Sequence, residues 1–149
     1  MKRYILLAAF AAACQPADKA EDGAVKGQAV DAQLTIQEDV VALRLNAPVS
    51  EPRACIIPIR IENGLDDPTN VTMIAFDLTG PGEDAKGNMF APVAAPGEAS
   101  VARVIVEGQS CDAFDTISIP EIRCTSGETS CEDKIELIDG ALLSFSQAG

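Results

Sequence analysis

The sequence predicts an all-β protein, an antiparallel β-sandwich of about seven to nine strands over residues 33–149. From Leu34 onward, short runs of β-branched and apolar residues alternate with Gly, Pro, Asn and Asp, at a spacing typical of sandwiches. The chain shows no long helical period and no repeat of about 20 to 50 residues. Its length suits a single domain with one hydrophobic core.

The clearest strand is ACIIPIRIEN, residues 54–63. Its apolar residues recur with a period of two, so that one face of the strand carries Cys55, Ile57, Ile59 and Ile61. Pro58 has no N–H to donate to a neighbouring strand. We therefore expect this strand to lie at a sheet edge or to carry a bulge near Pro58.

The other strands follow from the same pattern of short apolar runs bounded by turn residues. The glycine-rich segment GPGEDAKGN, residues 80–88, is expected to be a loop, and Gly140 to mark a bulge or turn. The remaining expected strands are, in order, TIQ (35–37), VVALRL (40–45), VTMIAFDLT (71–79), NMFAPV (88–93), SVARVIVEG (100–108), TISIPEIRC (116–124) and the two apolar pieces of KIELIDGALLSFS (134–146).

The chain begins with the pattern of a secretion signal. Lys2 and Arg3 form a positive start, an apolar run follows, and three alanines precede Cys14. The apolar run is too short to cross ~30 Å of hydrocarbon as a helix, which needs ~20 residues. We therefore expect residues 1–13 to be a signal peptide that is removed. The alternative is an ordinary secretory signal that is cut nearby, in which Cys14 is incidental.

In their order and spacing these residues resemble the bacterial lipoprotein signal, in which small residues precede an obligatory cysteine. Ala11 stands where leucine is usual in that signal. The resemblance implies that Cys14 is lipidated and anchors the protein to a lipid bilayer of the bacterial cell envelope. Gln15 is not the aspartate of the familiar inner-membrane retention rule, so the resemblance favours the outer membrane. Residues 14–32 are rich in Ala, Asp, Gly, Gln and Lys and are expected to be a flexible tether.

The composition argues against several classes of function. The chain has 23 acidic and 11 basic residues, and an acidic surface repels nucleic acid. It has no histidine, which removes Ser-His-Asp, Cys-His and His-based metal chemistry. It has no Trp, and its single Tyr lies in the signal, so aromatic platforms for sugars are scarce. We therefore expect no enzymatic activity, no cofactor and no nucleic-acid partner.

The later cysteines, Cys55, Cys111, Cys124 and Cys131, form an even set in a chain that is expected to leave the cytoplasm. They are expected to form disulfides. Four cysteines allow three pairings, and the sequence alone does not choose between them. In an immunoglobulin-like strand order, the strand that begins at Cys55 pairs with the strand that ends near Glu107. This order favours a Cys55–Cys111 bond, with Cys124–Cys131 closing the next hairpin.

The stretch from Cys55 to Gly108 resembles the FxLYD type of bacterial β-sandwich. In that family an aromatic-aspartate strand precedes a Gly-rich turn and later a Pro-Gly, and here Phe76 with Asp77 and Pro96 with Gly97 match these positions. Met73 and Ala75 replace larger apolar residues of the pattern. The resemblance implies an immunoglobulin-like lipoprotein domain without established chemistry.

The acidic loops supply the one remaining candidate site. In the assumed strand order, Asp66, Asp67 and Glu128 lie in loops at the same end of the sandwich and are candidate calcium ligands. No loop has the D-x-[DN]-x-[DN]-G pattern, and exposed carboxylates usually serve turns and solubility.

The expected function is that of a membrane-anchored, extracytoplasmic lipoprotein. We expect a non-enzymatic binding or scaffold module whose loops or open sheet edge meet an unidentified envelope protein. The alternatives are a small carboxylate-dependent hydrolase and a calcium-binding β-sandwich.

Overall fold

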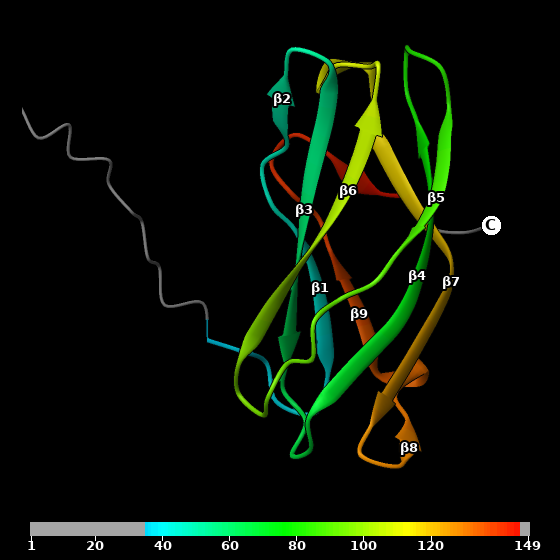
Figure 1. Cartoon of the computed structure of the whole chain (residues 1–149). Helices are drawn as coiled ribbons and strands as arrows, with labels where there is room; N and C mark the ends of the chain where they lie inside the picture. Colours follow the sequence, from blue (N-terminus) through cyan, green and yellow to red (C-terminus); the bar gives the residue numbers. More distant parts are fainter. Residues whose placement is uncertain (1–34, 147–149) are drawn as a thin grey trace, which may run out of the picture. The chain divides into compact units, whose positions relative to one another are not determined.

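Ten strands in two packed sheets make up the computed structural model, which describes residues 35–146 (Figure 1). The expected all-β sandwich is confirmed, with ten strands because several of them are only two or three residues long. The predictions for the signal peptide 1–13, the tether 14–32 and the lipidated Cys14 lie outside the described residues. In the part of the chain that the structure describes, no helix is long and apolar enough to cross a membrane.

The first sheet, called sheet A, is built around the long strand β3 (Ala54–Asn63). On one side β3 pairs with β6 (Ala99–Glu107), and on the other it pairs first with β2 (Val49–Glu51) and then with β1 (Val41–Leu45). These pairs are antiparallel, whereas β9 (Ile135–Ile138) runs parallel to β1. The antiparallel pairing of β3 with β6 is the neighbour relation that the sequence analysis expected between these strands.

The second sheet, called sheet B, has the order β10–β7–β4–β5, and β8 pairs with β7. Its two long strands are β4 (Thr69–Thr79) and β7 (Thr116–Ser126), which pair antiparallel with two shifts of register. The short ones are β5 (Ala85–Met89), β8 (Thr129–Ser130) and β10 (Ser144–Phe145). Two 3-10 turns interrupt the strands: η1 (Cys111–Ala113) precedes β7, and η2 (Glu132–Lys134) follows β8.

The expectation for Pro58 was wrong, because β3 lies inside sheet A with neighbours on both sides. Pro58 sits between the last β1 pair, Leu45–Ile59, and the first β2 pair, Val49–Ile56. Its carbonyl oxygen accepts a hydrogen bond from the Asn46 backbone N–H at 3.0 Å. The missing donor therefore falls where β3 changes partners, so a proline is tolerated in a central strand.

Three other expected elements also differ from the structure. Of the strand expected over residues 88–93, only Asn88 and Met89 lie in a strand. Residues 35–37 form no strand. The glycine-rich segment 80–88 contains most of β5, which pairs with β4 from Ala85 to Met89. Gly87 allows this pairing, because it lies opposite Phe76 and a Cβ there would lie 2.8 Å from the Phe76 ring. The missing side chain leaves room for this aromatic ring, as glycines in strands often do.

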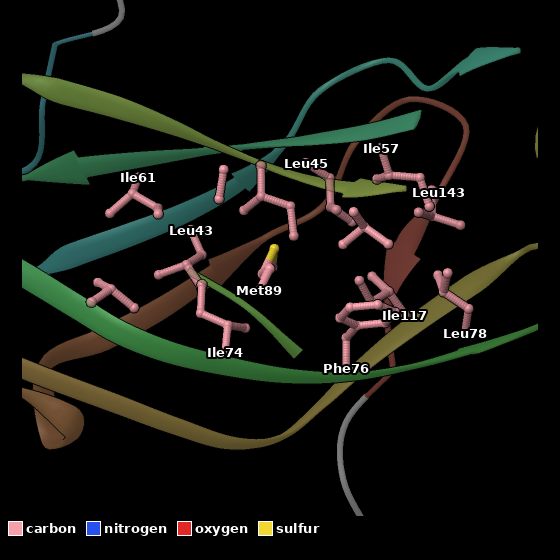
Figure 2. Close-up of a cluster of buried hydrophobic side chains, with 14 of the residues drawn as sticks. Leu43, Leu45, Ile57, Ile61, Ile74, Phe76, Leu78, Met89, Ile117 and Leu143 are labelled. Carbon is pink, nitrogen blue, oxygen red and sulfur yellow. The ribbon is translucent and has the colours of Figure 1, made fainter. Parts of the chain in front are cut away.

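The core lies between the two sheets and is formed by the inward residues of each strand (Figure 2). The predicted inward face of β3 is confirmed, since Cys55, Ile57, Ile59 and Ile61 are all buried. Sheet B contributes Ile74, Phe76 and Leu78 from β4 and Ile117 from β7. Burial of each large aliphatic side chain stabilises the fold by about 1.5–3 kcal/mol.

Candidate interaction surface

Two of the three candidate calcium ligands lie together in the structure. Asp66 and Asp67 line a pocket of about 160 Å³ together with Asp39 and Lys134, but Glu128 is not part of its lining. Among residues 35–146, no three Asp, Glu, Cys or His side chains are grouped to hold a metal ion. Two of the three candidates therefore lie in one pocket, and the calcium site stays a prediction.

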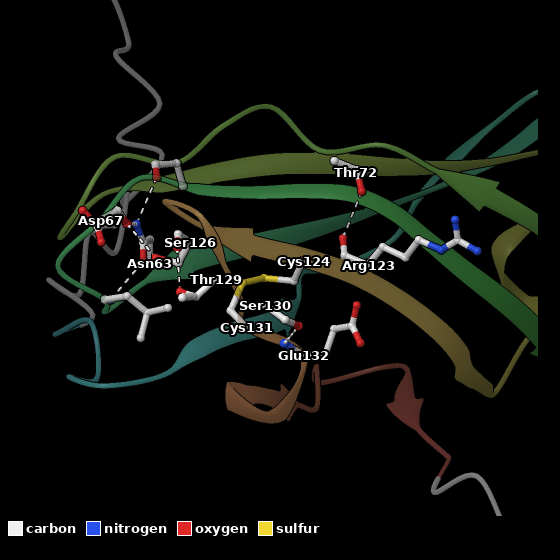
Figure 3. The surroundings of a disulfide bond; sticks show 12 residues. Asn63, Asp67, Thr72, Arg123, Cys124, Ser126, Thr129, Ser130, Cys131 and Glu132 are labelled. Carbon is white, nitrogen blue, oxygen red and sulfur yellow. Dashed lines mark hydrogen bonds between the residues drawn. A yellow bond between two sulfur atoms is a disulfide. The ribbon is translucent and has the colours of Figure 1, made fainter.

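The loop that contains Asp66 and Asp67 is held in place by the side chain of Asn63. This side chain is fully buried, and its Nδ2 donates to the backbone oxygens of Asp67 and Ala94 at 2.9 and 3.0 Å. Its Oδ1 accepts from the Leu65 N–H at 2.9 Å. Figure 3 shows Asn63 and Asp67 next to Ser126, whose hydroxyl also donates to the Asp67 oxygen. From the sequence, this asparagine is predicted only as the last residue of the strand 54–63, with no role in the loop that follows.

The four later cysteines form the two disulfides that the sequence analysis favoured. Cys55 at the start of β3 is bonded to Cys111 in η1, with a Cα–Cα distance of 4.7 Å. Cys124 and Cys131 are bonded across the β7–β8 hairpin, with a Cα–Cα distance of 5.2 Å (Figure 3). Disulfides persist in oxidising compartments, so these bonds indicate an extracytoplasmic location.

A buried carboxylate lies on the outer face of sheet A, the face turned away from sheet B. Glu62 is only 1% exposed, and its Oε1 accepts hydrogen bonds from the Nε atoms of Arg60 and Arg44 at 3.0 and 3.2 Å. The two arginines belong to the neighbouring strands β3 and β1 and stand directly opposite each other. A buried charge is tolerated only when it is paired in this way. The two ion pairs therefore hold the side chains of Arg44, Arg60 and Glu62 together on this face.

Apolar side chains continue the same face toward β2 and β6. Val49, Ile56 and Ile105 are cross-strand neighbours in β2, β3 and β6, and Val101 lies two positions from Arg103 on β6. Ile105 is 58% exposed and Val49 51% exposed. Single exposed apolar residues are normal, but an aligned row across three strands is typical of a surface that meets a partner.

Basic residues also gather on this face, although the chain as a whole carries a formal charge of −12. Arg44, Arg60 and Arg103 all stand there at alternating strand positions. Glu62 pairs with the first two. Within residues 35–146, Arg103 has no ion-pair partner, and its neighbour in register is Pro58. We call the residues Val49, Ile56, Val101, Arg103 and Ile105 the apolar-arginine face.

The fold and this surface define the protein as a disulfide-linked two-sheet β-sandwich with exposed apolar side chains on the outer face of sheet A. No family model matches the chain, so the FxLYD resemblance stays a prediction. The search of curated proteins also gave no match. Among solved structures the chain is similar to IrmA from Escherichia coli, with a TM-score of 0.53 and 15% identity. That likeness covers 66% of this chain and 90% of IrmA, and at this identity it shows the fold alone.

Proposed function

We propose that this protein is a lipid-anchored, non-enzymatic binding module of the bacterial cell envelope, held at the outer membrane. The observation that carries the proposal is the apolar-arginine face, which leaves Ile105 and Val49 more than half exposed. Contiguous patches of exposed apolar side chains on a soluble domain mark sites of interaction with a partner. The two disulfides support a location outside the cytoplasm, and the pattern around Cys14 supports a lipid anchor.

The anchor is tested by changing the candidate lipidation site. In the native bacterium grown with a labelled fatty acid, the parent protein is expected to incorporate the label and to sediment with the outer membrane. Cys14→Ser is expected to lose the label and to leave the membrane fraction. Retention of the label in Cys14→Ser would exclude this anchor, and sedimentation of the parent with the inner membrane would exclude the proposed location.

The binding face is tested by site-specific crosslinking in intact cells. A photo-crosslinking amino acid at Ile105 is expected to give a discrete adduct with an envelope protein, because this side chain stands on the exposed face. The same group at Thr125, an exposed position on β7 of sheet B, is the matched control and is expected to give none. Equal adducts at both positions, or none at Ile105, would contradict a binding role for this face.

A further inference from the structure

In the described domain, β6 is the longest strand that is paired on one side only. It has nine residues, whereas β5, at the edge of sheet B, has five, and β9, at the other edge of sheet A, has four. Between positions 35 and 146, the only strand that pairs with β6 is β3. Native proteins usually blunt an open edge by keeping it short or by placing a bulge or proline there. β6 contains no proline, and its register with β3 is unbroken from Ala99 to Glu107.

The hydrogen bonds at its two ends show which backbone groups of β6 face outward. The Gly108 N–H donates to the Arg53 oxygen, and the Asn63 N–H donates to the Glu98 oxygen. In an antiparallel pair, hydrogen-bonded positions alternate with positions whose N–H and C=O point the other way. The even-numbered residues of β6 therefore bond to β3. The N–H and C=O groups of Val101, Arg103 and Ile105 are left pointing to the open edge.

The side chains of these same three residues stand on the apolar-arginine face. A further strand laid along β6 would thus form backbone hydrogen bonds with Val101, Arg103 and Ile105 and place its own alternate side chains beside theirs. Next to Val101 and Ile105 such a strand meets exposed apolar surface. Next to Arg103 it meets a guanidinium that no carboxylate neutralises within the described part of the chain.

We propose that the open edge of β6 binds an extended segment of a partner protein by strand addition, and that this segment carries a carboxylate between two apolar residues. Counted along the partner, the pattern is apolar, any residue, Asp or Glu, any residue, apolar. Charge complementarity selects this occupant, because opposite charges in directly paired positions stabilise a sheet and like charges destabilise it. A second copy of this chain fits less well, since pairing β6 with itself about its midpoint places Arg103 opposite Arg103.

The inference rests on the proposed protein-binding function and specifies the partner's chemistry. It is tested with the whole folded protein and a synthetic nine-residue peptide of alternating Val and Thr with Glu at its centre. Binding is measured by fluorescence anisotropy, and the site by amide shifts in NMR spectra. We expect the largest shifts at Val101, Arg103 and Ile105, and a peptide with Lys at its centre is expected to bind about five- to tenfold more weakly.

Three variants distinguish strand addition from simple adhesion to the face. Ile105→Pro removes an N–H that points to the open edge, so it is expected to leave the β3 ladder intact and to abolish peptide binding. Ile105→Thr keeps both the N–H and the branched shape and is the matched control, with a loss of no more than a fewfold. Arg103→Glu is expected to reverse the preference, so that the Lys peptide binds more tightly than the Glu peptide. Thermal unfolding followed by circular dichroism checks that each variant folds.

Each other outcome overturns the inference. Equal binding of the Glu and Lys peptides would show that β6 does not select a carboxylate. Shifts concentrated on β5 or β9 would show that the peptide binds elsewhere. A concentration-dependent dimer that Arg103→Glu disrupts would show that a second copy is the occupant. If crosslinking at Ile105 succeeds in cells while the Glu peptide fails to bind, only the strand-addition inference fails. If crosslinking at Ile105 also fails, the proposed binding function fails with it.

Discussion

The double variant Cys55→Ala, Cys111→Ala is expected to unfold with a free energy about 4 kcal/mol below that of the parent protein. The bond joins residues 56 positions apart, so its loss frees a large loop in the unfolded chain. It also ties the start of β3, where Cys55 is fully buried, to the turn that leads into β7. Urea titration followed by far-UV circular dichroism measures the change.

The second disulfide provides the matched control for this prediction. Cys124 and Cys131 are only seven positions apart, so the double variant Cys124→Ala, Cys131→Ala is expected to lose about 2.5 kcal/mol on the same loop-entropy argument. Each variant removes two sulfur atoms, and only Cys111 of the four cysteines is partly exposed, so the difference between the variants mainly reports loop length. A larger loss for the short loop would show that local packing, and not chain entropy, governs both bonds.

Glu62→Ala is expected to lower the free energy of unfolding by about 2–3 kcal/mol. The carboxylate is buried between Arg44 and Arg60, and its removal leaves two arginine side chains on the sheet without their partner. We expect a smaller loss of stability than for a fully buried ion pair, because both arginines are partly exposed to water. Thermal and urea unfolding of the variant measure the effect.

Glu121→Ala is the matched control for Glu62→Ala. Glu121 also pairs with an arginine two positions away on the same strand, Arg123, at 2.9 Å, but more than half of each side chain is exposed. Exposed pairs of this kind contribute about 1 kcal/mol at most. Equal losses in the two variants would contradict the argument that burial gives the Glu62 cluster its strength.

Much of the fold could be predicted because the period-two pattern is local. The alternation in β3 identifies its buried face from the sequence alone, and the same holds for Ile74, Phe76 and Leu78 in β4. The positions of Pro58 and β5 could not be predicted in this way. Pro58 depends on where β3 changes partners, and β5 depends on the ring of Phe76 filling the space above Gly87. Both are tertiary facts that leave no local signal.

The candidate surface was only partly accessible from the sequence. The alternation in β3 placed Glu62 on the outward face, where a carboxylate is normally solvated. Its burial depends on the register that sets Arg44 of β1 directly opposite Arg60 of β3. The open edge of β6 likewise depends on which strands pair and which do not. The pocket lined by Asp39, Asp66 and Asp67 likewise depends on how loops from separate parts of the chain come together.

The parallel pairing of β9 with β1 sets the order in which the domain can fold. Val41 pairs with Ile135, so one side of the β1 strand stays open until nearly the whole chain has been synthesised. Such distant contacts also make folding slow, because a long loop must close before the pairing stabilises anything. Sheet A of a newly made chain therefore stays incomplete until nearly all of the domain has been synthesised.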